Sequence, residues 1–160
     1  MTTLYVRDGE EYREATAQDI FGRAQALMAQ RIRAGSPVFD SPGKTREFLR
    51  LRLGSLEHEV FSALFLTTRH RLIEYVELFR GTIDGASVYP REVVKEALAR
   101  NAAAVVVAHG HPSADPTPSR ADEIVTQRLR DALALVDIRL LDHIVASASG
   151  CVSMAELGLM

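Results

Sequence analysis

The sequence has one cysteine, no tryptophan and only short apolar runs. A single cysteine excludes an intrachain disulfide and any cysteine-rich zinc site. The longest unbroken apolar stretch, residues 102–108, is far shorter than the roughly 20 residues that span a bilayer. The first residues are polar and lack the apolar core of a secretory signal. We therefore expect a cytoplasmic protein with no membrane partner.

A surplus of one charge sign is also missing. The chain has 19 basic and 21 acidic side chains and a formal net charge of −2, so bulk electrostatics do not indicate a nucleic-acid binder. The hydrophobic content of 47% excludes disordered and collagen-like classes. The 160 residues correspond to about one globular domain.

The order of apolar and polar segments predicts an α/β fold, because strands alternate with helices in the second half. A polar leader over residues 1–14 and two helices form an expected N-terminal helical segment, residues 1–53, before a main domain over residues 54–160. The expected elements, in chain order, are helices at 16–33 and 41–53, strands at 60–67 and 72–79, turns at 81–87, a helix at 89–100, a strand at 103–108, a helix at 119–136 and a strand at 138–146.

Two histidines follow directly after the apolar strand at 103–108. His109 and His111 lie two residues apart, so in extended backbone their side chains point to the same side. A proline-rich loop leads from them to Ser119 and, one helical turn later, Asp122. Two imidazoles and one carboxylate are a common ligand set for catalytic zinc.

Each part of this pattern also has an ordinary structural explanation. A lone His-x-His is often a surface loop, and Ser119 with Asp122 is a typical helix cap. The joint spacing is more specific, because it arises in a shuffled chain with odds of about 1 in 2,000. A capped helix end also holds a metal-ligating side chain in a fixed position, so Ser119 and Asp122 could form a helix cap and still contribute to a metal site.

The segment HGHPSADPTPSRAD, residues 109–122, resembles the JAMM motif of JAB/MPN metallopeptidase domains, and in particular of their RadC-like branch. The resemblance runs from about Glu59 to the C-terminus, through HEVFSALFLTTRHRLIEYVELFRGT, VYPREVVKEALARNAAAVVVAHGHPS and RLLDHIV. It implies a single domain with a central mixed β-sheet flanked by helices, of the cytidine-deaminase-like type.

The resemblance also implies roles for residues of this chain. His109, His111 and Asp122 would hold Zn²⁺, Ser119 would assist, and Glu59 would be the general base of a peptide or isopeptide hydrolase. Glu57 is the competing glutamate for the base. The substrate, an unidentified protein or peptide, and the oligomeric state are open.

Two positions depart from the family's common HNHPSG sequence. Gly110 replaces the asparagine and Ala114 replaces the glycine. Neither change removes a ligand, but Ala114 would be strained if its position requires a positive φ. We also expect Asp142 and His143 to form a structural hydrogen-bonded pair rather than outer support for the metal.

Other functions stay open on the sequence alone. The repair role attached to the RadC family implies a DNA-associated accessory protein, although residues 40–80 carry seven basic and six acidic side chains and hence no strong basic patch. Two histidines and a carboxylate also fit a non-haem iron oxygenase. A zinc deaminase is excluded, because it needs a pair of cysteines.

Overall fold

A computed structural model describes residues 3–34, 38–39, 41–81 and 87–160. It divides the chain into two compact units, residues 1–35 and 36–160. The expected boundary at residue 53 differs from this division, because the second helix packs on the sheet of the main domain. Residues 82–86, which make up most of the expected turns at 81–87, lie outside the described residues.

The first unit contains a hairpin that the expected polar leader did not include. Strands β1 (Tyr5–Asp8) and β2 (Glu11–Glu14) pair antiparallel and precede helix α1 (Ala17–Ala34). Gly9 has φ +66° at the first position of the two-residue turn, as a type II′ turn requires. The strands of the hairpin are largely exposed, so burial gives them no alternating pattern that the sequence could reveal.

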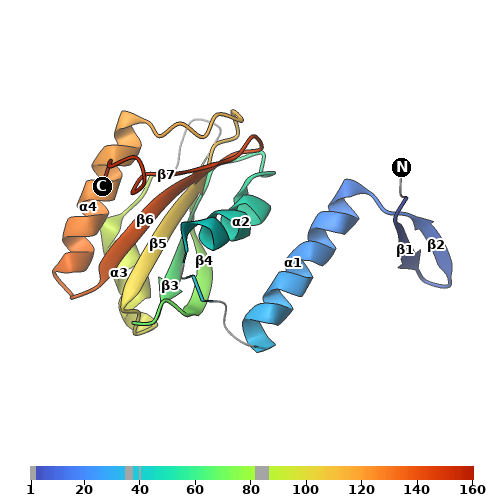
Figure 1. The fold of residues 1–160 in the computed structure, drawn as a ribbon, viewed down its shortest axis with the longest axis horizontal. Helices are drawn as coiled ribbons and strands as arrows, with labels where there is room; N and C mark the ends of the chain where they lie inside the picture. Colours follow the sequence, from blue (N-terminus) through green and yellow to red (C-terminus); the bar gives the residue numbers. More distant parts are fainter. Residues whose placement is uncertain (1–2, 35–37, 40, 82–86) are drawn as a thin grey trace. The chain divides into compact units, whose positions relative to one another are not determined.

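The second unit is built on a five-stranded mixed sheet in the order β4-β3-β5-β6-β7 (Figure 1). Only the β5–β6 pair is parallel. These elements are β3 (Val60–Leu66), β4 (Leu72–Arg80), β5 (Ala104–Gly110), β6 (Arg139–Ala146) and β7 (Cys151–Ser153). The α/β class with a mixed central sheet is confirmed, while the short β7 is an element that the sequence analysis did not anticipate.

Helices cover both faces of this sheet (Figure 1). Helices α3 (Pro90–Ala99) and α4 (Arg120–Ala134) contribute Val93, Leu129 and other apolar side chains to the main core with β3 and β5. Helix α2 (Pro42–Leu53) packs against β5, β6 and β7 on the other face. Since β3 and β5 are buried on both faces, they read as continuous apolar runs in the sequence.

The helix boundaries follow local chemistry. Pro42 and Pro90 occupy the first turns of α2 and α3, where a missing N–H costs nothing. Asn101 has φ +51° just after α3, which agrees with the expected stop there. None of the helices within the described residues is long and apolar enough to cross a membrane.

Candidate metal centre

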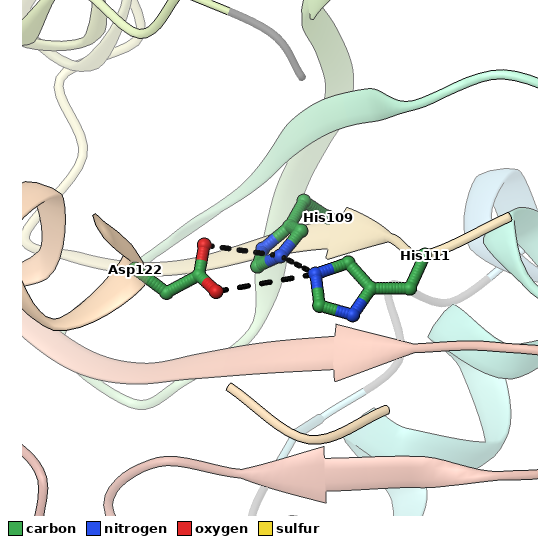
Figure 2. Close-up of side chains that lie close together, drawn as sticks. All are labelled: His109, His111 and Asp122. Carbon is green, nitrogen blue, oxygen red and sulfur yellow. Dashed lines mark hydrogen bonds and ion pairs between the residues drawn. The ribbon is translucent and has the colours of Figure 1, made fainter. Parts of the chain in front are cut away.

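Three side chains converge where β5 ends and α4 begins. β5 carries His109 near its C-terminal end, and His111 follows one residue after the strand. Asp122 lies in the first turn of α4. Figure 2 shows these three side chains directed toward one another. Among the described residues they are a group of three whose ligand atoms all lie within 4.8 Å of one another.

The distances within the group are short. The Nε2 atoms of His109 and His111 are 2.8 Å apart, and His109 Nε2 is 3.2 Å from Asp122 Oδ1. His111 Nε2 lies 3.9 Å from Asp122 Oδ2. The His109 side chain is only 1% exposed, whereas those of His111 and Asp122 are partly accessible. The group is therefore rooted in the core on one side and reachable from solvent on the other.

Asp122 is held in place by the cap of its own helix. Ser119 N and Ser119 Oγ both donate to Asp122 Oδ2 at 2.6 Å, while Asp122 N donates back to Ser119 Oγ. This reciprocal arrangement is a capping box, as the spacing indicates. Because Oδ2 receives both hydrogen bonds, Oδ1 is the oxygen turned toward His109.

His111 is oriented by the loop that follows it. Its Nδ1 lies 2.9 Å from the backbone carbonyl oxygen of Asp115. A carbonyl only accepts, so Nδ1 carries the proton and a neutral His111 presents an unprotonated Nε2 to the group. The Asp115 carboxylate in turn accepts from Thr117 N and Thr117 Oγ1, which shapes the loop.

His109 is supported from inside the domain by a second buried histidine. His109 Nδ1 is 2.8 Å from His143 Nε2, and His143 Nδ1 is 2.6 Å from Thr126 Oγ1. Thr126, on α4, donates its hydroxyl to the Asp122 carbonyl at 2.5 Å. This series of hydrogen bonds connects β5, which carries His109, with α4, which carries Asp122.

Asp142 and His143 are hydrogen-bonded to each other as expected, and the ring of His143 has a further contact that the sequence did not indicate. Asp142 is structural, because its carboxylate accepts from His143 N, Ser153 Oγ and Ala155 N. The ring of His143, by contrast, contacts His109. That contact depends on the parallel register that pairs Val107 with His143, which no local pattern reveals.

The electrostatics favour the forms that bind cations. Burial lowers the pKa of His109 to about 4 and that of His143 to about 3, so both imidazoles are neutral at pH 7. Burial raises the pKa of Asp122, but the neighbouring His109 and the hydrogen bonds from Ser119 lower it more, and the net pKa lies below the ordinary value. The carboxylate is therefore ionised.

The donor set fits a metal ion. The Asp122 carboxylate and the His111 Nε2 are acceptors, and a neutral His109 has only one ring proton for its two nitrogens. Acceptors converging on one point need a cation or a proton between them. Neutral imidazole nitrogens and a carboxylate oxygen suit zinc, and three protein ligands leave a fourth position for water.

Glu59 is not one of the three converging residues, but its backbone position places it at the same end of the sheet. Glu59 directly precedes β3, and in the antiparallel β3–β5 pair Phe61, two residues later, lies opposite His109. Gly81 N donates to the Glu59 carbonyl at 2.9 Å, which keeps this segment beside the end of β4.

The two departures in the loop have structural counterparts. Ala114 adopts φ +62°, the left-handed conformation in which a side chain is strained. Its carbonyl accepts from Ser147 Oγ at 2.9 Å and also from Ser149 Oγ, so the turn after β6 holds the loop. At Gly110 a Cβ would lie 3.3 Å from the Leu53 carbonyl oxygen, which leaves little room for a side chain there.

Comparison with known proteins finds relatives of this chain by sequence. A sequence family described as RadC-like JAB domain matches residues 39–159. A UPF0758 protein of Methylibium petroleiphilum is 58% identical over 137 residues, covering 86% of this chain and 61% of its own length. One from Thioalkalivibrio sulfidiphilus is 63% identical over 146 residues, covering 91% and 65%.

A UPF0758 protein of Vibrio cholerae is 57% identical over 139 residues, covering 87% of both chains. Against the Methylibium petroleiphilum relative, in contrast, the chain spans only about three fifths of the relative's length. The names of these relatives assign no reaction.

Proposed function

The chain belongs to the RadC-like JAB domain family, and from this membership and the geometry of the metal centre we propose that it is a zinc-dependent hydrolase of peptide or isopeptide bonds. The convergence of His109 Nε2, His111 Nε2 and Asp122 Oδ1 is the observation that carries the proposal. Three acceptors meet there, two of them partly accessible to solvent.

In this proposal His109, His111 and Asp122 hold the ion. A bound zinc ion would supply Lewis-acid polarisation of the scissile carbonyl and acidify the attacking water. Glu59 would take the proton from that water and pass it to the leaving amine, as a general base and then a general acid. The β3–β5 register supports this choice, because it places the start of β3, which Glu59 directly precedes, opposite His109.

Ser119 would donate a hydrogen bond to the carbonyl oxygen of the substrate as negative charge develops on it. Its hydroxyl currently donates to Asp122 Oδ2, so this role requires the hydroxyl to turn away from that oxygen. Asp122 would stay in position, since Ser119 N still donates to the same oxygen at 2.6 Å.

The first test is the metal content of protein purified without chelator or immobilised nickel, beside two variants on the same helix. Asp122→Ala removes a ligand, and Asp131→Ala removes an exposed carboxylate further along α4. We expect about one zinc per chain in the native protein and in Asp131→Ala, and a large loss in Asp122→Ala. Iron in place of zinc would instead support oxygenase chemistry, and no metal after zinc addition would overturn the proposal.

The base is tested with a matched pair of glutamate variants and a panel of peptide and isopeptide substrates. Glu59→Gln is expected to retain zinc and lose turnover, while Glu57→Gln retains both. Loss of turnover in Glu57→Gln alone would reassign the base. Full activity of Glu59→Gln would exclude Glu59 from the reaction.

A further inference from the structure

Hydrogen bonds link His109, His143, Thr126 and Asp122 in series, and all of them can donate in only one direction. The last acceptor in this series is the backbone carbonyl of Asp122, which can only accept. Thr126 Oγ1 lies 2.5 Å from that oxygen and 3.6 Å from Met154 Sδ, a far weaker acceptor. The single hydroxyl proton of Thr126 is therefore committed to the carbonyl of Asp122, four residues earlier in α4.

The donation from Thr126 to the Asp122 carbonyl determines which ring nitrogen of His143 carries the proton. Thr126 Oγ1 has no further proton to give, so it accepts from His143 Nδ1, 2.6 Å away. His143 is fully buried, and a neutral imidazole carries one proton only. With that proton on Nδ1, His143 Nε2 is bare and must accept from its neighbour, His109 Nδ1, at 2.8 Å.

The consequence reaches the metal centre. A proton on His109 Nδ1 leaves His109 Nε2 unprotonated and directed at His111 and Asp122, as a metal ligand must be. If the series ran the other way, His109 would carry its proton on Nε2 and present N–H to the ion. The tautomer of His109 is thus determined by Thr126 on α4, which acts through His143.

We propose that His143 and Thr126 are positioning residues that fix the Nδ1–H tautomer of His109 and so present its Nε2 to the metal. Neither residue contacts the ion or the substrate. The inference rests on the proposed zinc site, and it names two residues outside the ligand set. It also explains why both side chains are completely buried, with both ring nitrogens of His143 and the hydroxyl of Thr126 in hydrogen bonds.

The first measurement uses the native, zinc-free protein, so that no substitution can disturb folding. Long-range ¹⁵N–¹H NMR spectra of the histidine rings report which nitrogen is protonated. We expect Nδ1–H on both His109 and His143, with an unprotonated Nε2 on His143. A proton on His143 Nε2 would overturn the inference.

The second measurement compares two substitutions at one position. Thr126→Val keeps the shape and removes the hydroxyl, whereas Thr126→Ser keeps the hydroxyl and removes a methyl group. Without the hydroxyl, His143 Nδ1–H has no acceptor, so the proton moves to Nε2 and donates to His109 Nδ1, which forces the His109 proton onto Nε2. We expect Thr126→Val to weaken zinc affinity about 10- to 100-fold, and Thr126→Ser to stay close to native.

The two variants separate the possible results. Equal zinc affinity in native protein and Thr126→Val, with both folded by circular dichroism, would overturn the inference. Equal weakening in Thr126→Val and Thr126→Ser would also overturn it, since packing alone would then account for the loss. If the native protein binds no zinc, the proposed function fails, and the NMR tautomers of the native protein alone decide the inference.

Discussion

Replacing Ala114 with glycine should make the domain more stable. Ala114 has φ +62°, and the left-handed region costs a non-glycine residue about 1–2 kcal/mol. Glycine removes that strain but gains conformational freedom in the unfolded chain, which costs about 0.4–1 kcal/mol. The Ala114 side chain is exposed, so its methyl contributes little packing. The net effect is about 1 kcal/mol in favour of Ala114→Gly.

A change of about 1 kcal/mol in a domain of this size corresponds to roughly 3–5 °C in the midpoint of thermal unfolding. Differential scanning calorimetry of the metal-free protein resolves this shift. The matched control is Ala148→Gly, another exposed alanine in the turn that contacts the loop but without a positive φ. Its midpoint should fall, because only the entropy of the unfolded chain changes.

The opposite signs of the two shifts make the comparison decisive. An unfolding midpoint of Ala114→Gly at or below that of the native protein would refute the assignment of strain to Ala114. A rise of the midpoint in both variants would show that glycine stabilises both segments, so the positive φ of Ala114 would not explain its own shift.

Two further predictions concern the stability of the domain without metal. Burial lowers the pKa of His109 to about 4 and that of His143 to about 3, so below pH 6.5 the unfolded chain binds more protons than the folded domain. The free energy of unfolding should therefore fall as the pH is lowered from 6.5 to about 4. Urea titrations at fixed pH values measure this free energy, and a constant value over this pH range would contradict the prediction. Leu129→Ala, in the fully buried core, should cost about 2–5 kcal/mol in urea unfolding, while Leu135→Ala, at an 87% exposed position, should cost under about 1 kcal/mol. Similar losses in both leucine variants would contradict the packing described for α4.

The sequence predicts well those parts of the fold that carry a local signal. The apolar run of β5, the prolines that open α2 and α3, and the capping box of α4 are all encoded within a few residues. The three converging side chains could be predicted for the same reason, because strand periodicity and the first turn of a helix bring them together.

What the sequence could not predict depends on pairing between distant segments. The contact between His109 and His143 follows from the register of β5 on β6, which includes an irregularity between Val105 and Val106. The hairpin at Tyr5–Glu14 was missed because its strands are exposed and lack a buried face. β7 has three residues, too few to show any period.

The spacing of the three proposed metal ligands along the chain has a consequence for how the protein would respond to a chelator. His109, His111 and Asp122 lie within 14 consecutive residues and are already oriented by hydrogen bonds to Asp115, Ser119 and His143. An ion that joins groups so close together closes only a short loop, and it removes little freedom from the unfolded chain. The large core between α3, α4 and the sheet is built from apolar side chains, whose packing needs no ion. If the site holds zinc as proposed, a chelator should therefore abolish hydrolysis while the domain keeps its fold, in contrast to zinc fingers, which unfold when their metal is removed.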